Sequence, residues 1–173
     1  MSEVKELGPS IKREDILHFE GALSRIPGAE VLGTGDESKT CPVKHHFAPG
    51  VYSREMLIPK GKIIVSKIHR HEHHSFLMKG EITVVSEYGG IQRLKAPMVI
   101  LSKPGAKRIG FAHEDTIWVT VHPTKETDLK KIEEEVIAKS YEELELPADQ
   151  VAALKSDDQN VSKLIEVIKE SEA

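Results

Sequence analysis

Four histidines fall within six positions of the sequence, in the run KIHRHEHH that spans residues 67 to 74. Side chains alternate between the two faces of an extended strand, so His69, His71 and His73 are expected to share one face. Neutral imidazole binds zinc, iron, nickel and copper, and three ligands on one face leave positions open for water or a substrate. The run therefore predicts a divalent-metal site, and a bend at Arg70 would still leave two of these histidines together.

Two alternative interpretations of this run stay open. A histidine-rich tract can be a solvated loop with no metal, although this one lies between two β-type runs. Glu72 points to the opposite face, so it closes a site of two histidines and one carboxylate only if the strand twists. His74 is expected to lie behind the ligands or at the surface.

The elements that must position these residues are short apolar runs separated by turn residues. They span residues 51–58, 63–69, 75–78, 82–87, 91–94, 98–102 and 116–122, and a further short strand is expected near residues 44–47. At least seven strands in about 72 residues predict an all-β sandwich or barrel.

Helical periodicity flanks these strands on both sides. Apolar residues recur at helical spacing between residues 10 and 26, and an irregular arm rich in Gly, Pro and Asp follows. After Pro123 two further amphipathic helices are expected, one carrying Leu129, Ile132, Val136 and Ile137 and another around residues 161–168. We expect these helices to pack on the barrel or on a neighbouring subunit. The predicted organisation is an N-terminal helix and arm (1–49), a barrel (50–123) and an acidic helical extension (124–173).

The charge distribution excludes some classes of function. Residues 1–123 carry a net charge of about +3 and all nine histidines, whereas residues 124–173 carry about −7. Neither part has the basic stripe of a nucleic-acid-binding protein. No apolar run is long enough for a membrane helix or a signal peptide, and one cysteine, Cys41, forms no internal disulfide, so a cytoplasmic protein is expected.

The histidine run belongs to a longer pattern that resembles the first conserved motif of the cupin superfamily. Gly61, the run His69-x-His71-x-His73 and the segment FLMKGE at residues 76–81 follow its order of a glycine, a His-x-His pair, an acidic ligand and a second glycine. Gly80 lies seven positions after His73, so a histidine stands where cupins usually carry glutamate. The spacing from the leading His-x-His pair is also shorter.

The second cupin motif is only partly present. Lys103-Pro104-Gly105 matches its Pro-x-Gly, but Arg108 stands at the position of the histidine, and His113 is the nearest candidate for a fourth ligand. The segment 41–55 is similar to the corresponding part of small cupin-like proteins encoded by phages and prophages, most of which lack an assigned function. The resemblance covers about residues 50–123 and implies a cupin-type jelly-roll barrel, a metal bound by histidines and, often, a dimer.

Residues near the two motifs are the candidates for contact with a ligand in the mouth of such a barrel. Arg54, Lys107 and Arg108, with Lys103, would give the mouth a positive rim suited to a carboxylate or phosphate. The alternative is that these side chains only keep turns and strand edges in water. The candidate proton carriers are Glu72, His74 and Glu114.

Together these features predict a metal-binding cupin with His69, His71, His73 and His113 around one zinc, iron, nickel or manganese ion. As an enzyme of the dioxygenase, isomerase or hydrolase type it would act on a small acidic ligand. The alternative is a non-catalytic binding or assembly module, with a structural metal or none, in which the helices form the interface of a homo-oligomer, most simply a dimer. Fold alone does not decide between them.

Overall fold

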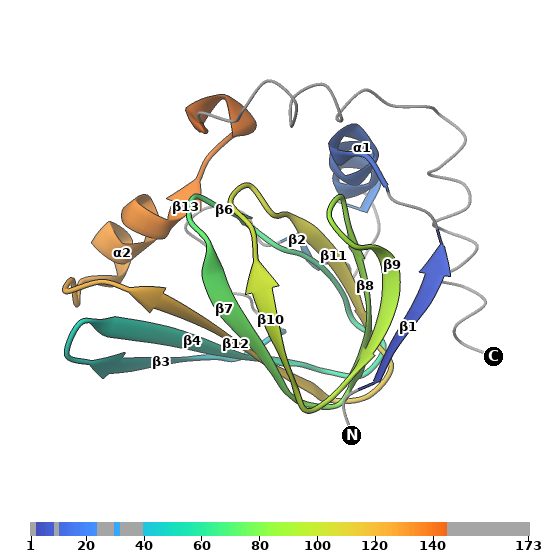
Figure 1. The fold of residues 1–173 in the computed structure, drawn as a ribbon, viewed down its shortest axis with the longest axis horizontal. Coiled ribbons are helices and arrows are strands. Elements are labelled where there is room, and N and C mark those ends of the chain that lie inside the picture. Colours follow the sequence, from blue (N-terminus) through green and yellow to red (C-terminus); the bar gives the residue numbers. More distant parts are fainter. Residues whose placement is uncertain (1–2, 9–10, 24–29, 32–39, 145–173) are drawn as a thin grey trace.

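The computed structural model describes residues 3–8, 11–23, 30–31 and 40–144, which form two facing β-sheets with helical segments toward one end (Figure 1). The first sheet contains, in spatial order, β1 (Glu3–Gly8), β9 (Gly90–Lys95), β8 (Glu81–Ser86), β11 (Arg108–Ala112), β5 (Ile63–Val65) and β2 (Glu30–Val31). The second contains β10 (Met98–Ser102), β7 (His73–Lys79), β12 (Thr116–Pro123), β4 (Val51–Ile58) and β3 (Val43–Ala48). The remaining elements are α1 (Arg13–Leu23), α2 (Leu129–Val136), the paired strands β6 (Ile68–His69) and β13 (Ile137–Ala138), and the 3-10 turn η1 (Tyr141–Glu143).

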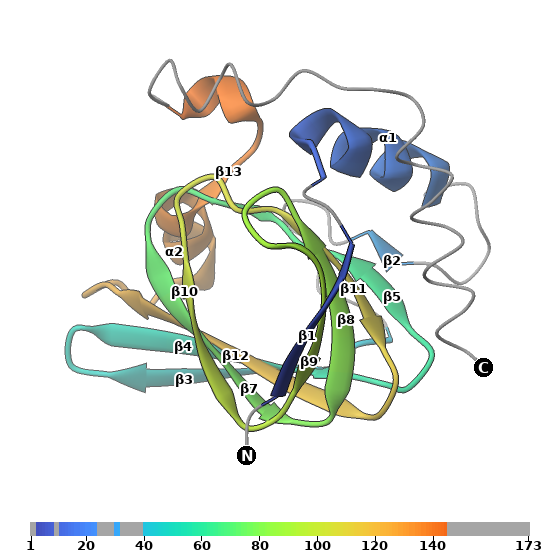
Figure 2. The ribbon, with the colours of Figure 1, turned by 45° about the vertical axis from the view of Figure 1, so that its right-hand side comes forward.

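Eight of these strands form a jelly roll. Strands β9, β8, β11 and β5 face strands β10, β7, β12 and β4, and each group is antiparallel. The chain passes from one sheet to the other at each connection between these eight strands, except at the hairpin that joins β8 to β9. Figure 2 shows the two sheets curving around a common interior. This order of strands is the arrangement of a jelly roll, so the expected mainly β fold is confirmed.

Alternation along the strands divides the apolar side chains between two clusters. Ile64 and Val84 pack inside the barrel, whereas their neighbours Val65 and Val85 pack outside against α1. The helix buries Ile16, Phe19 and Leu23 in that outer cluster. The N-terminal helix thus covers the outer face of the first sheet. It begins at Arg13, later than expected from periodicity, and residues 24–26 of the expected span lie outside the described residues.

Two local differences from the expected strands affect the site. The run 63–69 is not one strand, because β5 ends at Val65 and β6 begins at Ile68. Strand β11 was not expected, since its sequence RIGFA has a central glycine and is buried on both faces, which removes the alternation of a half-buried strand. The strand expected near residues 44–47 is present as β3.

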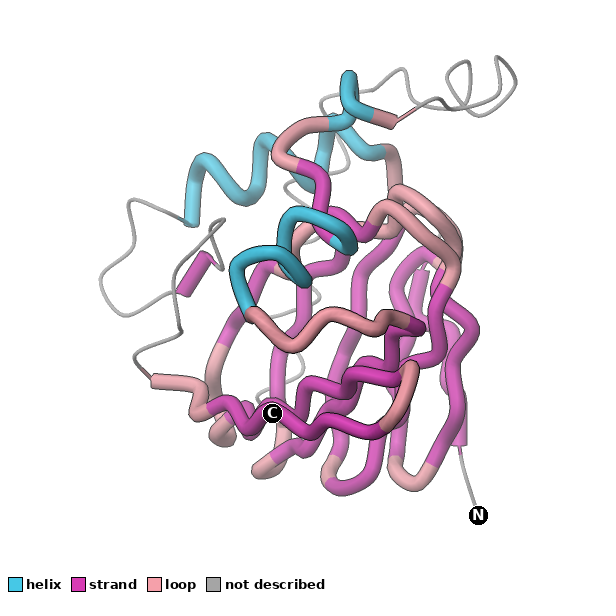
Figure 3. Tube along the Cα trace, turned by 90° about the vertical axis from the view of Figure 1, so that its left-hand side faces the viewer, coloured by secondary structure: helices cyan, strands magenta, loops and turns pink. Residues whose placement is uncertain are grey.

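Residues 129–143, which we call the cover segment, lie at the end of the barrel where β6 and β7 meet (Figure 3). The side chain of Asp128 accepts hydrogen bonds from the backbone N–H groups of residues 130 and 131, which caps α2. Ile132 and Val136 then pack against Tyr52 of β4. The helix ends before Ile137, which pairs with His69 instead. The second C-terminal helix, expected around residues 161–168, lies outside the described residues.

Neither of the described helices is long and apolar enough to cross a membrane.

Candidate metal centre

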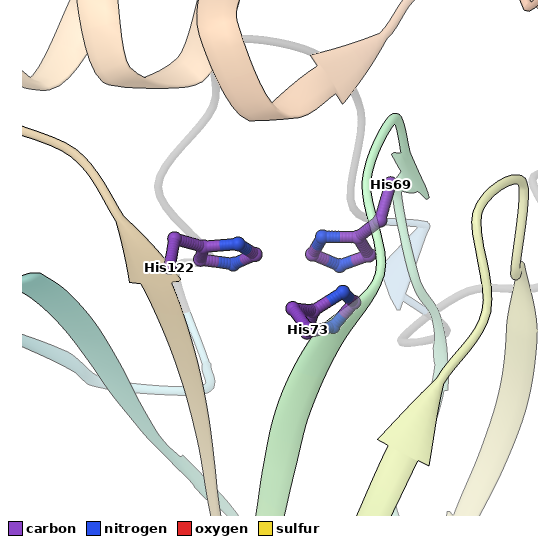
Figure 4. Close-up of side chains that lie close together, drawn as sticks. All are labelled: His69, His73 and His122. Atoms are coloured by element: carbon purple, nitrogen blue, oxygen red, sulfur yellow. The ribbon is translucent and has the colours of Figure 1, made fainter.

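Three histidines from three strands converge beneath the cover segment (Figure 4). His69 ends β6, His73 begins β7, and His122 lies one residue before the end of β12. One ring nitrogen of each lies within 4.8 Å of those of the other two. The ring centroid of His73 lies 4.1 Å from that of His69 and 4.7 Å from that of His122. We call these three residues the histidine group.

Strand pairing and a turn bring these residues together. Val121 of β12 lies opposite His74 of β7, so the next residue, His122, lies beside His73. Residues 70–72 leave the strand conformation, which turns the chain back and places His69 over the start of β7. The backbone N–H of Arg70 donates to the carbonyl oxygen of Val136 at 2.9 Å, so the cover segment fixes this turn.

The hydrogen bonds of the group leave nitrogen lone pairs facing inward. Nδ1 of His73 lies 3.1 Å from the carbonyl oxygen of His71, and a carbonyl can only accept, so this nitrogen carries the proton. The lone pair of the neutral ring is then on Nε2. Nε2 of His73 and Nδ1 of His69 are both buried and have no hydrogen-bond partner in the described part of the chain. Buried polar atoms without a partner are uncommon in proteins, so these two nitrogens are available to bind a water molecule or an ion.

Burial keeps the group neutral. It lowers the pKa of His69 well below the usual value, and the neighbouring rings of His73 and His122 act in the same direction. The pKa of His73 is lowered by burial, partly offset by the bond to the His71 carbonyl. Burial and the nearby His73 lower the pKa of His122 to about 4. All three rings are therefore neutral near pH 7, the form that binds metals.

The group fits a divalent metal ion. Three neutral imidazoles are a common ligand set of catalytic zinc, whose bonds to nitrogen are about 2.0–2.1 Å long. Two nitrogens bound tetrahedrally to one such ion lie about 3.3 Å apart. The three nitrogens lie within 4.8 Å of one another, so small rotations of the rings would bring them to that spacing. The unpartnered nitrogens of His69 and His73 gain a partner when an ion is bound. Zinc, iron, nickel and manganese all accept such ligands, so the residues do not select one of them.

Two of the expected ligands lie elsewhere. His71 is exposed and outside the group, because the chain turns at residues 70–72 and the alternation assumed for an unbroken strand does not apply. His113 follows β11 by one residue, and its Nε2 lies 2.7 Å from Oγ1 of Thr83. Arg108 lines the cavity beside the group, and His113 is five residues further along, which is about 17 Å in a strand. The place expected for a fourth ligand is thus far from the other histidines.

The three expected proton carriers face outward. Glu72 is exposed and pairs with Lys103 at 2.8 Å. His74 follows His73 on the opposite face of β7 and lies beside Phe76. Glu114 is exposed in the turn between β11 and β12. None of these three lines the cavity described next, so the geometry does not bring them near the histidine group.

A cavity of about 1000 Å³ lies under the cover segment and extends into the barrel. Arg54 and Arg108 both line it, from opposite sheets, and the positive charge of each lowers the pKa of His69. Lys107 does not line it, because its side chain is buried toward α1 and pairs with Glu20 at 2.8 Å. Of the three residues expected to contact an anion, Arg54 and Arg108 therefore line the cavity and Lys107 does not.

His122 and Tyr52 are the residues of the site that sequence reasoning missed. The Oη of Tyr52 lies 2.7 Å from Nδ1 of His45, and its ring stacks between those of His45 and His122. A signal existed: Trp118, Thr120 and His122 alternate along β12 and all line the cavity. The sequence does not indicate, however, that the end of β12 lies beside the start of β7.

No protein-family model matches the chain, and no curated protein matches it. Solved structures similar to it include an RmlC-like cupin from Shewanella frigidimarina, with 20% identity, coverage of 53% of this chain and 83% of that one, and a TM-score of 0.43. Ectoine synthase from P. lautus has 16% identity, coverage of 60% and 78%, and a TM-score of 0.48. KdgF from Halomonas sp. has 17% identity, coverage of 50% and 82%, and a TM-score of 0.43. Several of the similar structures are described as cupins.

Proposed function

We propose that this chain is a metal-binding protein of the cupin type whose histidine group holds one divalent ion facing the cavity. The observation that carries the proposal is the convergence of three neutral histidines, two buried and one half-buried, with two unpartnered ring nitrogens. Three protein ligands leave at least one coordination position open, as in catalytic rather than structural sites. We therefore favour an enzyme over a module with a purely structural metal.

The charges around the cavity favour an anionic ligand. Three neutral histidines do not compensate the charge of a divalent ion, and the guanidinium groups of Arg54 and Arg108 add to it. A carboxylate or phosphate bound there would receive charge-assisted hydrogen bonds from arginine. When bound, the ion would polarise an oxygen atom of the ligand as a Lewis acid.

Tyr52 and His45 are the residues placed to move a proton. Tyr52 lines the cavity, and its hydroxyl is hydrogen-bonded to the ring of His45, which can exchange a proton with it. Burial raises the pKa of Tyr52, so its hydroxyl stays protonated at neutral pH and is a proton donor. This pair takes the role that was expected for Glu72, His74 and Glu114.

Elemental analysis of protein purified without a histidine tag tests the proposal. We expect about one equivalent of metal after reloading, lost in His122→Ala and retained in His71→Ala, the matched control at an exposed histidine. Mutation of a residue that is only hydrogen-bonded to a metal ligand lowers metal affinity by roughly 10–100-fold. Removal of a ligand itself should lower it by more. Circular dichroism establishes that both variants are folded. Wild-type protein without metal after reloading, or full occupancy in His122→Ala, would contradict the proposal and favour a metal-free binding module.

A further inference from the structure

The wall of the cavity formed by the second sheet changes from polar to apolar with depth. Strand registers place the inward-facing side chains in rows across β7, β12, β4 and β3. The row nearest the cover segment contains His73, His122 and Tyr52; the next contains Ser75, Thr120, Arg54 and His45; and the third contains Leu77, Trp118, Met56 and Val43. The first and third rows are four residues apart, about 13 Å along the strands.

The wall formed by the first sheet has the same gradient. Arg108 lies at the polar level, where its backbone N–H donates to Oγ of Ser66. Two residues deeper, Gly110 lies between Ile64 and Val84. Ile82 also lines the cavity beyond them. Both sheets thus present a cationic band above an apolar floor.

The guanidinium of Arg108 is the charge best placed to bind an anion. It makes one hydrogen bond to a side chain, from Nη2 to Oγ of Ser102 at 3.0 Å, and has no carboxylate within ion-pair distance in the described residues. The carboxylate whose charge reaches it, Glu87, is already bound by two nitrogens of Arg13. An arginine has five N–H donors, so Arg108 can bind a further acceptor in the cavity.

We propose that the ligand of this site is an amphipathic carboxylate, with its charged group between the histidine group and Arg108 and its apolar chain along the floor formed by Ile64, Val84 and Trp118. This inference rests on the proposed function and adds the class of ligand. A short, fully hydrophilic acid would leave the floor in contact with water, at a cost for each apolar group not covered. An apolar chain displaces that water, and the charged group stays at the cationic level.

Calorimetric titration of the metal-loaded protein with acetate, butyrate, hexanoate and octanoate tests whether the site binds the apolar part of the ligand. Affinity should rise by about fourfold for each methylene that is fully buried. Octanamide, which has the same chain without the charge, should bind at least about tenfold more weakly than octanoate, because charge-assisted bonds are lost. Equal affinity for acetate and octanoate, or for octanoate and octanamide, would overturn the proposal.

Two pairs of variants locate the ligand. Arg108→Gln keeps a donor for Ser102 but removes the charge. It should weaken the binding of octanoate by about tenfold or more and have little effect on the binding of octanamide. Arg93→Gln, outside the cavity, is its control. Val84→Phe fills part of the floor and should weaken the binding of octanoate but not that of butyrate. Val99→Phe, at an exposed position, should change the binding of neither acid.

Metal content is measured on every sample. Absence of metal in the wild type counts against the proposed function. Retained metal with no dependence of affinity on chain length counts against the amphipathic ligand alone. If Arg108→Gln does not fold, Arg108→Lys keeps the charge without the paired donors, and unchanged octanoate affinity in that folded variant would exclude binding through two guanidinium donors.

Discussion

Ile137 pairs with His69 in antiparallel register, so the segment that covers the cavity is bonded to the strand that supplies one member of the histidine group. Arg70, the residue after His69, donates from Nε to the carbonyl oxygen of Ile137 at 2.9 Å and forms an ion pair with Glu143. Lys67 pairs with Glu133 of α2 at 2.5 Å. The same short stretch of chain thus positions a candidate metal ligand and fastens the cover segment.

Arg70→Ala should loosen the cover segment without unfolding the barrel. It removes a hydrogen bond and a partly exposed ion pair, together worth about 1–2 kcal/mol. Amide hydrogen exchange at residues 132–138 should therefore become roughly tenfold faster, while exchange in β7 and β12 stays unchanged. Lys103→Ala, which breaks the exposed pair with Glu72 beside the same turn, is the control. Equal protection of residues 132–138 in the two variants would show that Arg70 does not fasten the segment.

The metal-free protein should lose stability as the pH falls from about 6.5 to about 4. The pKa of His122 is lowered from 6.5 to about 4 in the folded state, and those of His69 and His73 are also lowered. Across this range the unfolded chain therefore binds more protons than the folded one, which favours unfolding on acidification. For His122 alone the shift corresponds to about 3 kcal/mol.

Urea unfolding of chelator-treated protein at several pH values measures this loss. His122→Asn should reduce the loss by roughly 3 kcal/mol, because its side chain does not titrate. His46→Asn, at an exposed position outside the group, is the control for the loss of a histidine. A wild-type stability that is constant between pH 7 and pH 4 would contradict the assigned burial of the three rings.

Gly80→Ala should be much more destabilising than Gly50→Ala. Both glycines have positive φ, +85° at Gly80 and +76° at Gly50, which costs alanine about 1–2 kcal/mol. A Cβ at Gly80 would also lie 2.6 Å from the carbonyl oxygen of Asp115, whereas one at Gly50 meets nothing within 4 Å. Gly80→Ala should therefore cost about 2 kcal/mol more, measured by urea unfolding. Equal costs would mean that the turn between β7 and β8 moves freely away from Asp115.

Arg13→Met should destabilise the packing of α1 on the barrel by about 3–5 kcal/mol. Arg13 is 4% exposed and binds both carboxylate oxygens of Glu87, at 2.8 and 2.9 Å. Its loss leaves a buried carboxylate whose pKa is already raised by burial. Because the pKa of Glu87 in the folded state is raised above the ordinary 4.5, the folded chain binds more protons than the unfolded chain above that pH. The variant should therefore lose further stability as the pH rises above about 4.5.

The second change Glu87→Gln tests this explanation. Combined with Arg13→Met, it removes the uncompensated charge, so it should restore part of the stability and abolish the added pH dependence. A double variant as unstable and as pH-sensitive as Arg13→Met would place the cost elsewhere, for example in the loss of the contact between Arg13 and the ring of Tyr141.

The sequence predicted two kinds of strand well. The first kind has one face in the interior, and the second is an apolar run with clear turn residues at both ends. Strands β4 and β10 have the predicted bounds, Val51–Ile58 and Met98–Ser102. The jelly-roll fold follows from such local signals together with the resemblance. Strand β11 was not predicted because it is buried on both faces and its sequence therefore lacks alternation.

The histidine group could be predicted only in part, because it depends on contacts between distant segments. Local alternation placed His69 and His73 on one face, and they do converge, but through a turn that also releases His71 to the surface. His122 enters through the pairing of β12 with β7, about 50 positions apart in the chain. No local pattern specifies that register, since it is fixed by the packing of the whole sheet.

The position of the cover segment at the end of the described chain has a consequence for synthesis. All eight strands of the barrel precede residue 129, where the cover segment begins. At about 5–20 residues per second, residues 124–143 reach the peptidyl-transferase centre roughly one to four seconds after the last barrel strand. The strands of the barrel therefore leave the ribosome before the cover segment does. The turn at residues 70–72, which places His69 over β7, is fixed by that segment and so acquires its bonds to residues 136 and 137 last.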